Sequence, residues 1–285
     1  MISVQEILTS IDIGLIFGIV AVGIYLTFRT INFADLTCDG SFVLGAAVSS
    51  VLVKYGTNPY IALFVSLIAG GIIGLCTGIL HVKVKISDLL SGIIVAFILY
   101  SINLRIMGNA PNITFMDNES VFSGRDTTLT LAGITFFTIA ALISLLFSGF
   151  GLKLRSTGYN RKFGPIIGIN IKSMIIIGLM LSNSMIALGG GLFSQYQGFC
   201  DISEGTGTLV SGLASVVIGE KVLQFKKEPL LILSCIVGSI IYRIFINIAL
   251  NSDVFGIKTS DINLVTGFMI ISIIAARRMK KNDCA

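Results

Sequence analysis

The chain has 285 residues, of which 54% are hydrophobic and only 12% are charged, and its mean hydropathy is +0.93. Soluble domains carry about a quarter charged residues, so this composition excludes a water-soluble globular protein. The apolar runs are long and lack the alternation of a β-barrel. They predict an all-α fold, a polytopic helical membrane protein in which residues 1–285 form a single transmembrane domain.

The formal net charge of +5 does not indicate a nucleic-acid partner, because Lys and Arg lie in short segments between the apolar runs. His81 is the only histidine, so a histidine-based metal site is excluded. The cysteines show no metal-ligand spacing; they are Cys38, Cys76, Cys200, Cys235 and Cys284. We therefore expect no metal and no cofactor.

A membrane-spanning helix needs about 20 mostly apolar residues. On this basis we expect about nine membrane segments, two of them short. In chain order they cover residues 11–28, 41–53, 60–82, 89–107, 129–150, 171–193, 209–219, 230–250 and 264–276. The short segments are the second and the seventh.

An acidic, glycine-bearing insert separates the first segment from the short second one. Its polar residues include Asn32, Asp35, Asp39 and Ser41. An ionisable side chain at membrane depth is costly and points to function. We therefore expect these side chains near the path of a transported solute. Two alternatives stay open: the insert is a loop at the membrane surface, or Asp39 caps the helix that follows it.

A second insert follows the sixth segment and precedes the short seventh one. It contains Gln195, Gln197, Asp201 and Glu204, which we expect at the outer mouth of the path. Solvation at the surface is the alternative for the two carboxylates. Paired interrupted segments at matching places in two halves are typical of transporters with inverted repeats. Such a repeat would divide the chain into halves 1–150 and 151–285.

The connections between segments alternate in their content of Lys and Arg. Those after the third, fifth and seventh segments are basic, as is the C-terminal tail, and the first segment ends at Arg29. The N-terminus and the connections 56–59, 109–128, 194–208 and 251–262 are poor in basic residues. Cytoplasmic connections carry the basic excess. The pattern predicts a multi-pass protein of the cell membrane with its N-terminus outside and its C-terminus in the cytoplasm. The long polar connection 109–128 is then outside, either as a docking surface for a partner or as a plain loop.

The basic connection 151–173 also has an apolar side, formed by residues such as Phe163, Ile166 and Ile169. Anchoring by positive charge explains its Lys and Arg residues but not these apolar ones. A short amphipathic helix that lies on the membrane and offers one side to a partner explains both.

The stretch from Leu154 to Glu220 resembles the membrane permeases of the branched-chain amino acid type, which are transmembrane subunits of ATP-binding-cassette (ABC) importers. The cytoplasmic loop carries the resemblance through its arginine start and its Gly-Ile-Asn end, with Arg161-Lys162-Phe163 in place of a small-residue centre. The resemblance implies that this loop couples transport to an ATPase. The coupling residues would be Arg155, Gly158, Asn160, Arg161, Lys162, Gly168, Ile169 and Asn170.

The opening run Asn32–Thr37 with Asp39–Phe42 is similar to the subgroup of tryptophan and tyrosine transport permeases. The resemblance implies a pair of permease subunits in the lipid bilayer, cytoplasmic ABC ATPase subunits and an extracytoplasmic substrate-binding protein. We expect the pair to be a homodimer, and a related second subunit is the open alternative. The solute would be small, such as an amino acid.

The chain contains no G-x-x-x-x-G-K-[ST] P-loop, so ATP hydrolysis would take place on another polypeptide and this chain would not be an enzyme. The main alternative is an ion- or proton-coupled secondary transporter with Asp35 and Asp39 as coupling groups. Arg243 is the main other charge within a deep segment, where it either snorkels or pairs with a neighbour. A membrane-embedded enzyme is a more distant alternative, because the H-E-x-x-H and G-x-S-x-G motifs are absent.

Overall fold

The computed structural model describes residues 4–159, 164–223, 228–251 and 266–267. Two short strands, β1 (Asn112–Thr114) and β2 (Phe199–Asp201), pair antiparallel with Ile113 opposite Cys200. All other regular elements of the described residues are helical. They are α1 (Val4–Tyr25), the π-helical η1 (Leu26–Thr30), α2 (Cys38–Lys54), α3 (Pro59–Val82), α4 (Asp88–Ile106), α5 (Thr127–Phe147), α6 (Gly149–Tyr159), the 3-10 turn η2 (Gly164–Ile167), α7 (Ile171–Gln197), the 3-10 turn η3 (Ile202–Gly205), α8 (Thr208–Val222) and α9 (Glu228–Asn251).

The prediction of a polytopic helical membrane protein is confirmed, since seven helical stretches within the described ranges are long and apolar enough to cross a membrane. They cover residues 4–30, 59–82, 88–106, 127–147, 171–197, 202–222 and 230–250. The expected second segment, α2, has 17 residues and is not one of them. The expected ninth segment, 264–276, lies outside the described residues apart from 266–267. The count of nine and the inverted repeat stay predictions.

Several expected segment ends differ from the helices: the first segment begins at Val4 and not at residue 11, and the sixth ends at Gln197 and not at residue 193. The fifth segment ends at Phe147 and not at residue 150, because Ser148 adopts an extended conformation and turns the chain into α6. The seventh segment is longer than 209–219, since α8 continues to Val222 and η3 precedes it almost directly. Polar residues at both ends of this stretch hid its true length in the sequence.

Polar and glycine residues define the ends of several helices. Asn58 precedes Pro59, and its side chain accepts a hydrogen bond from the amide of Tyr60 at the start of α3. Ser87 begins α4 in the same way. Gly198 ends α7 in the left-handed region, with φ of 79°, which a residue with a Cβ adopts less readily.

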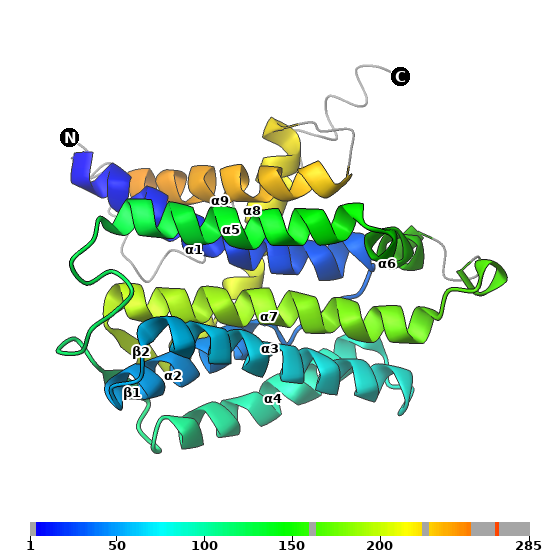
Figure 1. The fold of residues 1–285 in the computed structure, drawn as a ribbon, viewed down its shortest axis with the longest axis horizontal. Helices are drawn as coiled ribbons and strands as arrows, with labels where there is room; N and C mark the ends of the chain where they lie inside the picture. The colour runs from blue at the N-terminus through cyan, green and yellow to red at the C-terminus, as the bar shows by residue number, and fades with distance from the viewer. Residues whose placement is uncertain (1–3, 160–163, 224–227, 252–265, 268–285) are drawn as a thin grey trace.

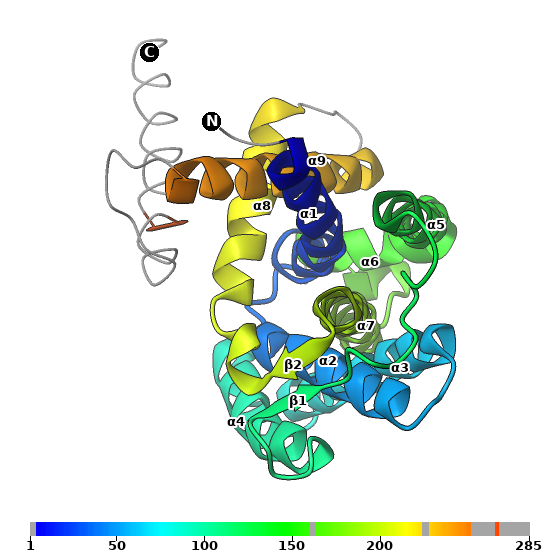
Figure 2. The same cartoon turned by 90° about the vertical axis from the view of Figure 1, so that its left-hand side faces the viewer.

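Figure 1 shows α1, α5 and α7 lying along one common axis, with α7 antiparallel to the other two; the N-terminus and the two strands lie at one end and α6 at the other. We call these the strand end and the α6 end. Figure 2 looks along α1, α5 and α7 and shows α8 crossing them. The connection 109–128, which contains β1, and the start of α1 therefore share one end, as the charge alternation predicts.

The central helix α7 packs closely against α1, α2 and α3. A Cβ atom added at Gly45 of α2 would overlap the carbonyl group of Ala187, and one at Gly70 of α3 would overlap that of Asn183. Such small residues let helices approach one another where lipid provides no hydrophobic driving force for their association. Close packing around α7 thus fixes the positions of the elements that carry the inserts.

Candidate functional site

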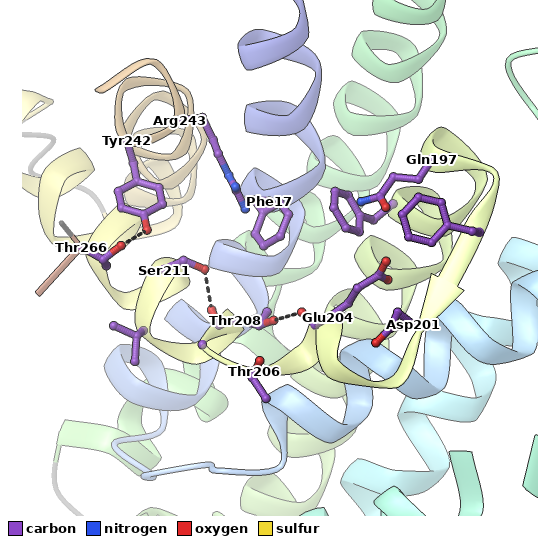
Figure 3. A pocket seen from close by; sticks show the side chains of 14 residues that line it. Phe17, Gln197, Asp201, Glu204, Thr206, Thr208, Ser211, Tyr242, Arg243 and Thr266 are labelled. Atoms are coloured by element: carbon purple, nitrogen blue, oxygen red, sulfur yellow. Dashed lines mark hydrogen bonds between the residues drawn. The ribbon is translucent and has the colours of Figure 1, made fainter. Parts of the chain in front are cut away.

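A cavity of 470 Å³ lies beside β2, between α1, the end of α7, the start of α8 and α9. Figure 3 shows the side chains around it, and we call it the aromatic cavity. It is lined by Phe17, Phe193, Gln197, Phe199, Asp201, Glu204, Thr206, Gly207, Thr208, Val210, Ser211, Tyr242, Arg243 and Thr266. The cavity is therefore apolar on one part of its wall and polar or charged on another.

The arginine of this cavity lies near the rings of Phe17 and Tyr242. The rings of Phe17 and Phe193 meet edge to face, with centroids 5.4 Å apart. The Cζ atom of Arg243 lies 3.7 Å from the centroid of the Phe17 ring, which is a cation–π contact. Its Nε atom is buried and has no hydrogen-bond partner among the described residues. The ring thus partly compensates for the loss of water around the cation, and this donor is left unused.

Two carboxylates of the second insert line the cavity, and they differ in their hydrogen bonding. Asp201 accepts hydrogen bonds from the amide and the hydroxyl of Ser203, at 2.8 and 2.5 Å. These bonds stabilise the ionised form and hold the pKa of Asp201 below its ordinary value. Both carboxylate oxygens of Glu204, in contrast, are buried without a hydrogen-bond partner in the described part of the chain. Gln197, from the end of α7, lies on the same wall.

Asp35 lies in a fully buried hydrogen-bond network between the first insert and α7. Its Oδ1 atom accepts from the amide of Thr37 at 2.9 Å and also bonds the Thr37 hydroxyl, while Oδ2 accepts from Asn183 Nδ2 at 2.8 Å. Asn183 Oδ1 in turn accepts from the hydroxyl of Ser41 at 2.6 Å. Neither Asp35 nor Ser41 lines a cavity described above. Their expected place near the solute path stays a prediction.

Asp39 connects α2 to α8. Its Oδ1 atom accepts from the amide of Leu209 at 2.8 Å and its Oδ2 atom from that of Gly207 at 3.4 Å. The alternative in which Asp39 caps its own helix is wrong, because α2 begins at Cys38 and the carboxylate is directed to another helix. It caps the N-terminus of α8, where amide groups have no partner within the helix.

Gln195 and Asn32 lie in two other places. Gln195 is buried; it donates to the Ser49 hydroxyl at 2.9 Å and accepts from the amide of Val121 at 3.1 Å, so it links α7, α2 and the connection 109–128. Asn32 lines a second cavity of 360 Å³ near the α6 end, which we call the Arg29 cavity. The four residues expected at the outer mouth thus divide: three line the aromatic cavity and Gln195 holds helices together.

The Arg29 cavity contains an ion pair between η1 and the end of α8. The guanidinium of Arg29 donates to both carboxylate oxygens of Glu220, from Nε at 2.8 Å and from Nη2. Gly158 and Tyr159 of α6 line the same cavity. The ion pair therefore lies directly beside the predicted coupling loop.

Arg155 and Gly158, at the start of that loop, make contacts within the protein. Arg155 donates to the carbonyl oxygens of Gly151 and Leu146, each at 3.3 Å, and so stabilises the corner between α5 and α6. A Cβ at Gly158 would overlap the carbonyl group of Thr30, so α6 packs directly on η1.

The end of the predicted loop begins α7. Gly168 has φ of 75°, Ile169 is buried, and the side chain of Asn170 accepts from the amide of Ser173 as the cap of α7. The remaining predicted coupling residues lie outside the described part of the chain: Asn160, Arg161 and Lys162.

Sequence reasoning missed Asn183 and the aromatic wall. Asn183 stands within an apolar segment, and a polar residue there is a usable signal for an interhelical contact. The phenylalanines gave no signal, because in a membrane segment an aromatic residue facing a cavity cannot be told from one facing lipid.

Comparison with known proteins places the whole chain in one group. Residues 7–276 match the family described as "Branched-chain amino acid transport system / permease component". A tyrosine transport system permease protein of Clostridioides difficile is 41% identical over 92% of this chain and 88% of its own length. The ribose import permease of Escherichia coli K12 is 26% identical, covering 82% of this chain and 74% of the relative.

Among solved structures, an ABC transporter described as of the metal-chelate type, in an inward-facing conformation, has a TM-score of 0.51 at 16% identity. The match covers 95% of this chain and 86% of that one, and it supports the fold.

Fold and comparisons together define the membrane-spanning subunit of an ABC transporter. The chain belongs to the branched-chain amino acid transport permease family. It is the permease of an importer for a small solute, and ATP hydrolysis takes place on a partner subunit. The family also implies a substrate-binding protein.

Proposed function

We propose that this permease imports an aromatic amino acid and that the aromatic cavity is its solute site. The observation that carries the proposal is the composition of the cavity wall, where phenylalanine rings stand beside the charged side chains of Glu204 and Arg243. Most ligand sites are largely apolar with a few placed polar groups. The relative that is 41% identical is named for tyrosine transport, which agrees with this class of solute.

The two cavities suit a transporter that alternates between two states. The aromatic cavity and the Arg29 cavity both involve α1, α8 and α9, the first beside β2 and the second beside α6. Between them, Gly212 of α8 packs against Ile24 of α1. We expect the helices to separate there and at the Arg29–Glu220 ion pair when the path opens to the cytoplasm, a population shift driven by the state of the partner ATPase.

The same reading assigns the faces of the protein. The strand end, with the N-terminus and the connection 109–128, faces outward and receives the substrate-binding protein. The α6 end faces the cytoplasm and the ATPase, in agreement with the basic connections. Gln197, Asp201 and Glu204 contact the solute, whereas Asp35, Asp39, Ser41 and Gln195 hold the helices that shape the cavity. Two copies of the chain form the permease unit.

The test is uptake of radiolabelled L-tyrosine by proteoliposomes that contain this chain, its ATPase and its binding protein. ATP enclosed on the ATPase side should drive accumulation. ADP in place of ATP, or an ATPase variant that binds ATP without hydrolysing it, should abolish accumulation. Unlabelled L-tryptophan should compete and ribose should not. Accumulation by this chain alone under an imposed ion gradient would contradict the proposal.

A further inference from the structure

The aromatic cavity contains a buried acid and a buried base that do not contact each other. Both carboxylate oxygens of Glu204 and the Nε atom of Arg243 are buried without hydrogen-bond partners among the described residues. The ion pair found in the described ranges joins Arg29 to Glu220 instead, at the α6 end. Glu204 and Arg243 therefore face the same space without neutralising one another.

Their separation follows from the elements that carry them. Glu204 belongs to η3, which is fixed between β2 and the start of α8. Arg243 comes from α9 and lies over the ring of Phe17, while the neighbouring Tyr242 hydroxyl is hydrogen-bonded to Thr266 at 2.7 Å. Figure 3 shows the Arg243 side chain reaching in past Phe17 from one side and Glu204 pointing in from the other. The charges are thus held on opposite walls of one cavity.

Such an arrangement is unfavourable unless something occupies the space. Burial of an ionised group removes its hydration; the Phe17 ring offsets only part of this loss for Arg243, and no hydrogen bond from the described residues offsets it for Glu204. Charged side chains within membrane segments commonly mark the path of a substrate. A molecule that carries both a negative and a positive group, separated by a short distance, would satisfy both side chains at once.

We propose that the cavity binds a zwitterionic α-amino acid, with its carboxylate on Arg243, its ammonium group on Glu204 and its side chain against Phe17, Phe193 and Phe199. This inference rests on the proposed function and assigns the groups of the solute to named residues. Arg243 presents N–H donors that suit a carboxylate, and Glu204 presents two acceptors for an ammonium group. The Oδ1 atom of Asp201 accepts from Ser203 and its Oδ2 atom accepts from Asn112 Nδ2 at 3.4 Å, so we assign the ammonium group to Glu204 and not to Asp201.

The experiment measures the thermal stability of the purified permease–ATPase complex, without binding protein, in the presence of millimolar ligands. The probes are L-tyrosine, tyramine, which lacks the carboxylate, 3-(4-hydroxyphenyl)propionate, which lacks the amine, and ribose. A ligand that binds only the folded state raises the unfolding temperature by mass action. L-tyrosine should stabilise the complex most, each analogue should bind about tenfold more weakly or worse, and ribose should have no effect.

Variants of the two charged residues test which group of the solute each one binds. In Arg243→Gln the preference for L-tyrosine over tyramine should fall about tenfold, while the preference for L-tyrosine over 3-(4-hydroxyphenyl)propionate is retained. In Glu204→Gln the preference over the propionate should fall and the preference over tyramine should be retained. Arg243→Lys and Glu204→Asp keep the charges and should keep part of each preference, which separates loss of charge from misfolding. Arg105→Gln and Glu119→Gln, at exposed positions, are the matched controls and should behave as the native chain.

The proposal is overturned if L-tyrosine does not stabilise the complex, if ribose stabilises it equally, or if both amide variants keep the native order of ligands. ATP-driven uptake separates this failure from failure of the function. If L-tyrosine is accumulated but the order of ligands does not depend on Glu204 and Arg243, the function stands and this assignment is wrong. If no aromatic amino acid is accumulated, the proposed function itself is wrong.

Discussion

Replacing Asn183 with alanine tests whether the network around Asp35 holds the first insert against α7. Asn183 Nδ2 donates to Asp35 at 2.8 Å, and its Oδ1 atom lies 2.6 Å from the Ser41 hydroxyl and 3.1 Å from that of Thr37. A buried polar group left without a partner costs about 1–3 kcal/mol, and a neutral interhelical hydrogen bond in a membrane contributes about 0.6 kcal/mol. Loss of these three contacts, and of the bond from Asn183 Nδ2 to the carbonyl oxygen of Leu179 at 3.0 Å, should lower the free energy of unfolding by about 2–4 kcal/mol.

Asn103→Ala is the matched control. Asn103 is equally buried, but its side chain makes a single bond, from Nδ2 to the carbonyl oxygen of Gly40 at 3.1 Å, and its Oδ1 atom has no partner in the described part of the chain. Its loss should cost about 1 kcal/mol or less. Reversible unfolding by detergent titration in mixed micelles measures both. Equal losses in the two variants would refute the reasoning.

Asp35→Asn completes this test, because the amide keeps the shape of the carboxyl group. The NH₂ group takes the place of one carboxylate oxygen and cannot accept a hydrogen bond there. Either the bonds from Thr37 or the bond from Asn183 are therefore lost, and we expect lower stability. Uptake should then fall only in proportion to the amount of folded protein. If Asp35 contacted the solute instead, uptake per folded molecule would fall while the unfolding free energy stayed near its native value.

The remaining predictions concern other parts of the molecule. Glu220→Lys should lower uptake by removing the ion pair at the Arg29 cavity, and the added change Arg29→Glu should restore it, as a double-mutant cycle of uptake rates would show. Gly45→Val should destabilise the protein because its side chain would overlap α7, whereas Gly133→Val, with open space around it, should not shift the thermal unfolding temperature. The pKa of Asp201 is lowered by bonds from the neighbouring serine, so its contribution to stability is present above the unfolded value near 3.8 and lost as pH falls through the lower folded value; Asp201→Asn should remove this part of the acid dependence in pH-scanned unfolding.

The class of fold could be predicted from the sequence because membrane helices are specified by length and composition alone. The inserts were also visible, since Asp35, Asp39 and Glu204 interrupt apolar sequence. The partners of these carboxylates were not visible. Asp35 is 148 positions from Asn183 and Asp39 is 170 positions from Leu209, and a single sequence contains no signal that pairs such distant residues.

The aromatic cavity could not be predicted for a related reason. Its wall combines α1, α7, α8 and α9, so it depends on how the helices cross. Arg243 was visible as an isolated charge in an apolar run. Whether its side chain extends to the membrane surface or packs on a buried ring depends on Phe17, which lies more than two hundred positions earlier. Periodicity indicates which face of a helix is apolar and does not distinguish lipid from a cavity.

The contacts of α8 show how the two inserts are mechanically joined. Asp39 accepts hydrogen bonds from the N-terminal amides of α8, and Arg29 pairs with Glu220 near the C-terminal end of α8. Both ends of this helix are therefore bonded to the stretch from η1 to the start of α2. α6 packs on the same stretch where Gly158 contacts Thr30. A displacement of α6 must therefore move this stretch or break its packing against α6. Because the stretch is bonded to both ends of α8, its movement would displace α8 as well. Because η3, which carries Glu204, lies directly before α8, the wall of the aromatic cavity is connected through named contacts to the helix beside the predicted ATPase face.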